Sequence, residues 1–193
     1  MKKYLLLSLL TIVSSFSFAQ MQTWVNDPAH SRLGFVVKHL TISEIDGRFT
    51  NFNVKVTTSK ADYSDAQIEL SADVASINTD IEARDNHLRS ADFFDAEKYP
   101  TLTFKSTSFV KVDEKKAKLN GELTFHGITK PVSLDVTYWG SVTNPMNNQE
   151  TAGFQINGTI NRKDFALGPN FPEAIVGETI RIIANVEFSP LKK

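Results

Sequence analysis

The sequence contains no cysteine. Disulfide bonds, thiolate metal sites and a lipid attached through cysteine are therefore excluded, and the fold must depend on its hydrophobic core. Beyond the N-terminus no apolar run approaches the ~20 residues of a membrane-spanning helix, so we predict no membrane span in the mature chain. No cluster of lysines and arginines is interleaved with aromatic residues, which argues against nucleic-acid binding.

The N-terminus has the layout of a secretory signal peptide. Lys2 and Lys3 precede an apolar run from Tyr4 to Val13, and small or polar residues lead to Ser17-Phe18-Ala19. An N-terminal membrane anchor is disfavoured because the run is too short to span a bilayer. We expect cleavage after Ala19, leaving one periplasmic or secreted domain over 20–193. Because two lysines and no acids are removed, the formal net charge falls from −1 to −3.

Alternation of apolar and polar residues dominates the rest of the chain. In 66–74 every second residue is apolar, which is typical of an antiparallel strand with one face in water. Runs of this kind predict about eight strands, over 33–39, 49–56, 66–74, 102–112, 117–125, 132–138, 152–160 and 180–188, with a further short strand at 22–26. The connections are mostly short, so the expected order is an up-and-down meander.

Three local patterns decide how these strands are interpreted. The step of three between Phe49 and Phe52 breaks the two-residue period and predicts a bulge. Asn157-Gly158 could form a hairpin turn, but the alternation continues through it in phase, so we place Gly158 within a strand. In the strand over 102–112, Val110 and Val112 continue the inward face.

The segment from Arg84 to Pro100 does not fit the strand pattern. Thr79 and Glu82 have the spacing of a capping box, which predicts a helix start, and Pro100 requires the helix to end before it. Phe93, Phe94 and Tyr99 need an apolar surface to cover. We therefore predict a short helix and an aromatic lid at one end of the sheet.

An antiparallel sheet of this length can hide its apolar face in a sandwich or in a closed barrel. Small residues recur on the predicted inner face, namely Ala66, Ala72, Gly121, Ala152, Gly158 and Ala184. Small inward residues favour a hollow barrel. The alternative, an interior filled by the helix or its aromatic residues, stays open at this point. The predicted fold is all-β: an eight-stranded, up-and-down, lipocalin-like barrel with one short helix capping an end.

The chain resembles the YceI family of exported, lipocalin-like proteins over nearly all of 22–189. The residues that carry the resemblance are Arg84-Asp85-x-His87-Leu88-Arg89-Ser90-x-Asp92-Phe93-Phe94-Asp95 with Lys98-Tyr99-Pro100, His30-Ser31 with Phe35 and His39, Gly47-x-Phe49, His126-Gly127-x-Thr129-Lys130-Pro131-Val132, Asn161-Arg162-Lys163-Asp164-Phe165 and Val176-Gly177. The resemblance implies an elongated barrel whose apolar channel takes up a polyisoprenoid, such as a polyprenyl carrier or an isoprenoid quinone tail. One departure is Ala166, where family members often have glycine.

The predicted ligand is a long apolar lipid, because the strand-borne inner face carries no Asp, Glu, Lys or Arg. We predict that it contacts inward residues of the strands and the aromatic pair of the insert: Phe35, Val37, Phe52, Ile68, Leu70, Ala72, Phe93, Phe94, Phe104, Gly121, Leu123, Leu134, Val136, Phe154, Ile156, Gly158, Ile182 and Ala184. No cofactor is predicted. No metal site is predicted either, since the four histidines lack ligand spacing.

The charged residues of the insert have two interpretations. His87 with Asp85 or Asp92 could form the acid–base group of an enzyme acting on a small hydrophobic substrate. We favour the alternative that arginine–carboxylate pairs tether the insert to the barrel, because no nucleophile accompanies them. Arg84 or Arg89 could also meet a polar headgroup.

The preferred function is a non-enzymatic binding protein that transports, stores or sequesters an isoprenoid lipid. A stress-response protein with a solid barrel is a third possibility, and a homodimer is left open.

Overall fold

The computed structural model describes residues 20–192, which form one antiparallel sheet with a short helix at one end. The elements in chain order are β1 (Gln22–Asn26), β2 (Arg32–His39), β3 (Ser43–Phe49), β4 (Phe52–Thr58), β5 (Gln67–Asp73), the 3-10 helix η1 (Val74–Ser76), β6 (Ile77–Asn78), α1 (Glu82–Arg89), β7 (Thr101–Lys111), β8 (Lys116–Phe125), β9 (Ile128–Thr143), β10 (Glu150–Asn161), the 3-10 helix η2 (Arg162–Phe165) and β11 (Val176–Pro190). The predicted signal peptide, 1–19, lies outside the described residues.

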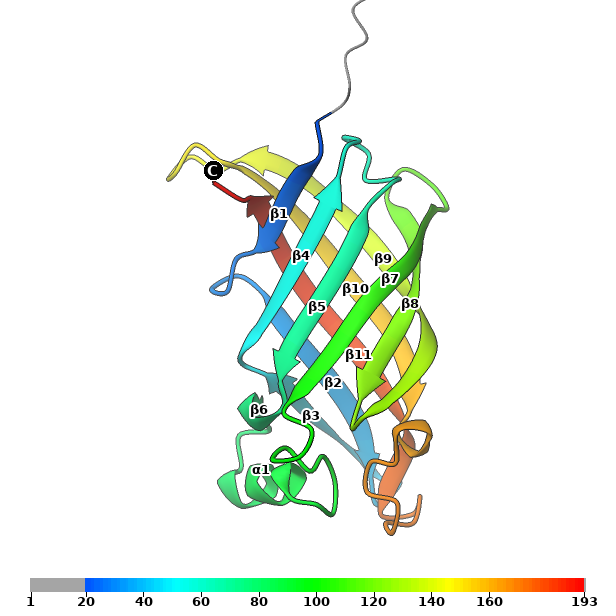
Figure 1. Ribbon diagram of the computed structural model, residues 1–193. Coiled ribbons are helices and arrows are strands. Elements are labelled where there is room, and N and C mark those ends of the chain that lie inside the picture. Colours follow the sequence, from blue (N-terminus) through cyan, green and yellow to red (C-terminus); the bar gives the residue numbers. More distant parts are fainter. Residues whose placement is uncertain (1–19, 193) are drawn as a thin grey trace, which may run out of the picture.

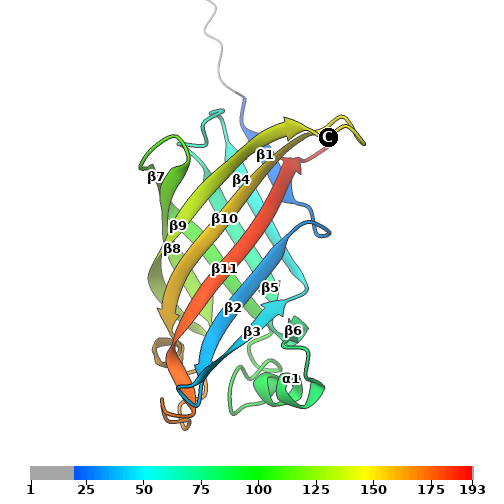
Figure 2. The ribbon, with the colours of Figure 1, turned by 180° about the vertical axis from the view of Figure 1, so that it is seen from behind.

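The sheet closes into the eight-stranded, up-and-down barrel predicted from the sequence (Figures 1 and 2). β1 pairs with β4 on one side and with β11 on the other, which completes the ring. β2 pairs with the rest of the same edge of β11, from Val176 to Asn185. β1 and β2 therefore lie end to end and together fill one of the eight strand positions of the barrel wall. In the same way β3 continues into β4, and β5 into β6.

Three of the eight strand positions in the wall are therefore segmented and five are continuous. The three broken positions are neighbours, with pieces of two to eight residues, whereas β7 to β11 are unbroken strands of ten to sixteen residues. Asp27-Pro28 interrupts the first position, and η1, capped by the Asp73 side chain, interrupts the third.

The predicted bulge between Phe49 and Phe52 is wrong. Phe49 ends β3 and Phe52 begins β4, with a bend at Thr50 and Asn51 between them. The three-residue step thus marks a corner between two strand segments. The interpretation of Asn157-Gly158 is confirmed, because β10 runs through Gly158, which pairs with Ile182.

A real bulge lies in β7 and reverses the predicted facing of its second half. The register with β8 shifts between Ser106 and Ser108. Phe109 consequently packs against the core, whereas Val110 and Val112 are 52% and 65% exposed. The prediction that these two valines face inward is wrong, because one extra residue changes which face every later side chain occupies.

The helix is present, but the predicted capping box is not formed. Ile81 is the N-cap of α1 and makes no side-chain cap bond. The Thr79 hydroxyl instead donates to Asp85 Oδ1 at 2.6 Å, and the Thr79 backbone N–H donates to the same oxygen at 2.8 Å. The buried Asp85 carboxylate thus receives the Thr79 N–H that the capping box assigned to Glu82, and the Thr79 hydroxyl, which the capping box required as an acceptor, acts as a donor.

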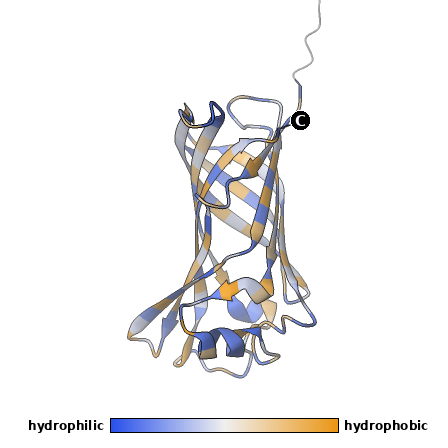
Figure 3. Cartoon of the chain, turned by 90° about the vertical axis from the view of Figure 1, so that its left-hand side faces the viewer, coloured by the Kyte–Doolittle hydropathy of each residue, from blue (hydrophilic) through white to orange (hydrophobic). Residues whose placement is uncertain are grey.

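The barrel has two distinct ends. The α1 end carries α1, the β2–β3 hairpin and the loop from η2 to β11, while the terminal end carries both described chain ends and the loop 59–66 (Figure 1). Hydrophilic and hydrophobic residues alternate along the strands (Figure 3), as expected for a wall with one wet face. No helix among residues 20–192 has the length and apolar character needed to cross a membrane.

We predict that Gly121→Ala destabilises the barrel. A Cβ at Gly121 would lie 2.3 Å from Phe104 Cζ and 2.5 Å from the Lys105 carbonyl oxygen, so the buried ring or the backbone must move. Overpacking of this kind costs about 1–3 kcal/mol. Urea unfolding measures the change.

Gly153→Ala is the matched control, because its Cβ would meet nothing closer than 3.7 Å. It should leave stability unchanged or raise it by up to about 1 kcal/mol. Equal stability of the two variants would contradict the predicted packing of Phe104 over Gly121.

Candidate functional site

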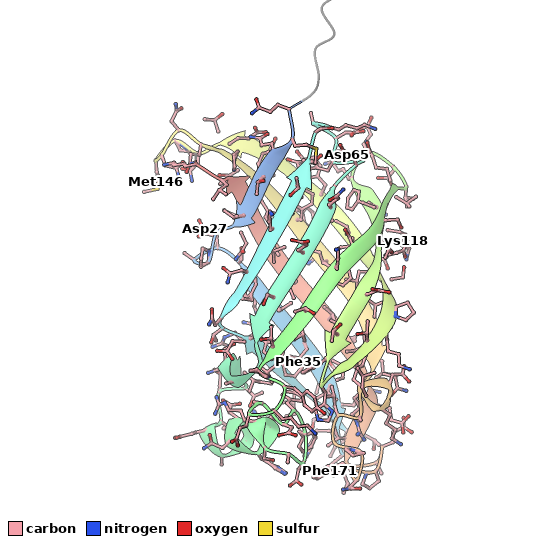
Figure 4. The ribbon with its side chains drawn as sticks, in the orientation of Figure 1. Asp27, Phe35, Asp65, Lys118, Met146 and Phe171 are labelled. Atoms are coloured by element: carbon pink, nitrogen blue, oxygen red, sulfur yellow. The ribbon has the colours of Figure 1, made fainter. Side chains whose placement is uncertain are left out.

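The candidate site is an apolar cavity of about 180 Å³ inside the barrel, and its wall exposes no polar surface. Trp24, Tyr63 and Phe188 line it towards the terminal end, and Phe94 and Phe125 towards the α1 end. Figure 4 marks these ends by Asp65, in the loop that carries Tyr63, and by Phe171. The interior is therefore neither solid nor wide: a continuous apolar lining surrounds a limited space.

Most of the residues predicted to contact a ligand line this cavity. They come from the segmented strands, from the continuous strands and from the insert: Phe35, Phe52, Ile68, Leu70, Phe94, Phe104, Leu123, Leu134, Val136, Phe154, Ile156, Ile182 and Ala184. Their position is thus as expected, and their role in binding stays a prediction.

The structure places the other predicted residues outside the lining, namely Val37, Ala72, Phe93, Gly121 and Gly158. The two glycines do not contribute open space, because a Cβ at Gly121 would meet Phe104 and a Cβ at Gly158 would meet Leu134 Cδ2 at 2.4 Å. Small inward residues therefore make room for neighbouring side chains of the protein. The argument from small residues to a hollow interior does not hold at these positions.

The lining also includes residues that were not among the predicted ligand contacts. They are Trp24, Leu33, Gly34, Phe49, Val54, Val56, Tyr63, Ala66, Leu102, Phe109, Leu119, Phe125, Val132, Ile160, Ile180, Val186 and Phe188. Many sit on recognised inward faces and follow from the alternation. Tyr63 could not be found in this way, because it lies in a polar loop and has a positive φ of 58°.

Asp65 organises the loop that places Tyr63 at the terminal end. Its carboxylate accepts hydrogen bonds from the Thr58 and Ser59 hydroxyls and from the Ser59 and Lys60 backbone N–H groups. The side-chain bonds from Ser59 and Thr58 hold the pKa of Asp65 far below its usual value. Tyr63 packs edge-on against Trp24 and Phe154, with ring centroids 5.8 and 5.3 Å apart. Burial raises its pKa.

Phenylalanine side chains close the α1 end. The Phe94 ring lies 5.0 Å from that of Phe125 and 6.4 Å from that of Phe49. Phe93, one residue earlier, points away from the cavity and stacks on Phe171 at 4.5 Å. The insert therefore supplies one ring to the cavity and one to the loop after η2.

The charged residues of the insert tether it to the barrel, but through backbone carbonyls. Arg89 donates to the carbonyls of Ala75 and Ile77 at 2.7 and 2.9 Å. Arg84 donates to the Thr79 carbonyl at 2.6 Å and to the Thr79 hydroxyl at 2.7 Å. The expected tether is present, although the expected carboxylate partners of the arginines are replaced by carbonyl oxygens.

Arg162 holds the loop after η2 in place, again through backbone carbonyls. Its side chain is 1% exposed, and its guanidinium donates to the carbonyls of Leu167, Gly168, Phe171, Val176 and Gly177. Burial lowers the pKa of this guanidinium.

Ala166, in the same loop, has the left-handed conformation, with φ 52° and ψ 33°. The loop thus adopts at alanine a backbone geometry that glycine accommodates more easily.

The acid–base group considered for an enzyme is not assembled around the cavity. His87 Nε2 lies 3.3 Å from Asp92 Oδ2, and both side chains are exposed. Asp85 is buried and accepts from Thr79. His87, Asp85 and Asp92 are all absent from the cavity lining.

Asp27, His30 and Glu187 bring three possible metal-ligand atoms within 4.8 Å of one another. Sequence spacing did not reveal this group, because Glu187 comes from the last strand. His30 Nδ1 is 2.9 Å from Asp27 Oδ2, so the two side chains bond each other across the break between β1 and β2. This bond lowers the pKa of Asp27 and raises that of His30, with a further contribution from Glu187 to the latter.

A closed antiparallel barrel with a wholly apolar interior defines a lipocalin-like class of proteins, whose fold can enclose an apolar ligand. Within that class the chain belongs to the YceI family, since the family described as YceI-like domain matches residues 24–188. It is 37% identical over 175 residues to the UPF0312 protein SA2479 of Staphylococcus aureus, covering 88% of this chain and 98% of the relative.

Solved structures show the same architecture. A Campylobacter jejuni YCEI protein is 28% identical, with a TM-score of 0.73 over 97% of this chain and all of the other. A polyisoprenoid binding domain from Saccharophagus degradans, implicated in plant cell wall breakdown, is 17% identical, with a TM-score of 0.63 over 88% and 99% of the two chains. At that identity the second likeness concerns the fold.

The pair Asp27–His30 predicts a pH-dependent contribution to stability. Because the folded state raises the pKa of His30 above 6.5 and lowers that of Asp27 below 3.8, the contribution is fully present between pH 3.8 and pH 6.5. It is lost as pH rises through the folded-state pKa of His30 and as pH falls through that of Asp27. Asp27→Asn should move the pKa of His30 back towards 6.5, measured by NMR titration of the imidazole. Asp135→Asn, which removes a distant carboxylate paired with Lys118, is the control. A His30 pKa unchanged in Asp27→Asn would disprove the assignment.

Proposed function

We propose that the protein binds a long apolar lipid of the polyisoprenoid type inside the barrel. The observation that carries this proposal is the cavity wall, which exposes no polar surface from Tyr63 at the terminal end to Phe94 at the α1 end. A ligand in such a site gains free energy from burial, and a charged or multiply hydroxylated ligand would lose its hydration without compensation.

The energy available from burial is sufficient for binding. Each buried methylene contributes roughly 0.8 kcal/mol. About ten such groups would therefore contribute roughly 8 kcal/mol, which corresponds to about micromolar affinity before the costs of ordering the ligand. No polar contact along the shaft is needed for useful affinity.

The size of the cavity indicates how a long chain is accommodated. A space of about 180 Å³ holds a short apolar segment, and a longer chain needs side chains at the ends of the cavity to move. Tyr63 is the side chain best placed to do so, because it belongs to a loop, whereas most other lining residues belong to strands.

The polyisoprenoid class is supported by the Saccharophagus degradans neighbour, which is a polyisoprenoid binding domain of the same fold. The predicted signal peptide leads us to propose that the protein is exported, to the periplasm or out of the cell. We propose that there it transports, stores or sequesters such a lipid. We propose binding without catalysis, because His87 and Asp92 are exposed and lie outside the cavity lining.

Purification of the mature protein from cells of the organism that encodes it tests this proposal. Organic extraction followed by mass spectrometry should recover an apolar lipid in stoichiometric amount. Recovery of protein without lipid, combined with failure to take up added polyprenols and isoprenoid quinones, would refute it.

We predict that Leu70→Trp reduces uptake of radiolabelled geranylgeraniol at least several-fold. Leu70 is a half-buried residue of the cavity wall, so a larger ring there occupies ligand space. Ser71→Trp, one residue away on the exposed face, is the matched control and should bind normally. Retention of the label on gel filtration, with circular dichroism as the folding check, measures the difference. Normal uptake by a folded Leu70→Trp would place the ligand elsewhere.

A further inference from the structure

The two ends of the cavity differ in their capacity for hydrogen bonding. The α1 end is closed by phenyl rings, those of Phe49, Phe94 and Phe125, which carry no polar atom. The terminal end is closed by Trp24 and Tyr63, whose rings carry an indole N–H and a hydroxyl. Neither polar atom is exposed to the cavity in this structure, whose wall presents no polar surface, so the chemistry of the two ends differs for a ligand only once Tyr63 moves and uncovers the Trp24 ring.

Two buried donors at the terminal end have no acceptor among residues 20–192. They are Nε1 of Trp24, whose side chain is 4% exposed and lines the cavity, and Nδ2 of Asn26, which is 7% exposed. Buried tryptophan and asparagine nitrogens usually find a partner, because an unpaired buried donor costs about 1–3 kcal/mol. Two of them on one short strand are an exception that needs a physical explanation.

Both residues lie on the buried face of β1, but Trp24 lines the cavity and Asn26 does not. Trp24 and Asn26 are two residues apart in β1, so their side chains share a face. Asn26 is paired with Phe188, which lines the cavity. The orientation of the Asn26 amide is set by Oδ1, which accepts from the Val54 backbone N–H at 2.7 Å and leaves Nδ2 as the free donor.

We propose that the indole N–H of Trp24, uncovered when Tyr63 moves, forms a headgroup subsite for an apolar lipid with a hydrogen-bond acceptor oxygen at one end, with Asn26 Nδ2 as a second donor on the same face of β1. The proposal rests on the proposed function and adds the orientation of the ligand. The oxygen, as in an alcohol, an ether or a quinone carbonyl, lies at the terminal end, and the tail points to the phenyl rings of the α1 end. A donor-only subsite selects an acceptor, and the dry surroundings strengthen the bond.

The fold gives the subsite a route to solvent. Trp24 packs against Tyr63, which is held in place by the loop 59–66. A movement of this loop uncovers the Trp24 ring, so a tail can enter first and its oxygen arrives last. The order of entry matches the proposed orientation.

The test compares two ligands that differ only in the acceptor. Geranylgeranyl methyl ether accepts a hydrogen bond, and the hydrocarbon of the same chain does not. In Trp24→Phe, which keeps an aromatic ring and removes the N–H, affinity for the ether should fall about three- to tenfold, while affinity for the hydrocarbon should change less than about twofold. Trp139→Phe is the matched control, since Trp139 is 64% exposed, and should change neither value.

A second measurement does not depend on the variant. The indole N–H resonance of Trp24 in the wild-type protein, assigned by ¹H–¹⁵N NMR, should move downfield with the ether and not with the hydrocarbon. Equal losses of both ligands in Trp24→Phe, or equal shifts of the resonance with both, would overturn the subsite and leave the proposed function intact. Failure of the wild-type protein to bind either ligand would refute the proposed function itself, and the subsite with it.

Discussion

The pairing of β1 with β11 turns a sheet into an enclosure, and every other property of the site depends on it. This ladder is short, from Trp24 opposite Pro190 to Asn26 opposite Phe188, and the backbone bonds from Leu191 to Thr23 and from Asp27 to Glu187 extend it. Without it the wall would be open between β4 and β11 at the terminal end, and the apolar residues there would be exposed to water, whereas the ladders of β2 with β11 and β3 close the α1 end. The strand that closes the barrel is also the one that carries the two unpartnered donors.

Two arginines at the α1 end bind backbone carbonyls. Arg89 donates to carbonyls of η1 and β6, and Arg162 donates to carbonyls of the loop after η2. A planar group with five donors can satisfy several carbonyls together. Arg89 thereby holds in place the insert that carries Phe94.

Local alternation was enough to predict the strands and most of their inward faces, because a two-residue period records which face of a strand is buried. The choice of a closed barrel over a sandwich rested on the small inward residues and on the family resemblance. Alternation could not locate the bulge that brings Phe109 inward and turns Val110 outward, since one inserted residue leaves no compositional signal. Nor could it show that Phe104 covers Gly121, because that contact crosses between strands. At Thr79 the predicted capping box is not formed, because its backbone N–H and its hydroxyl both donate to the buried carboxylate of Asp85.

The uneven construction of the wall determines how the barrel can deform. On one side, β7 to β11 are continuous strands, with register shifts at Ser106/Ser108 and at Gly153/Phe154; on the other, three consecutive positions are interrupted at Asp27-Pro28, at Thr50-Asn51 and at η1. At these interruptions the ladder already lacks backbone bonds, so a rotation there would break few more. We therefore expect the interrupted side to yield to a bulky guest before the side made of continuous strands does.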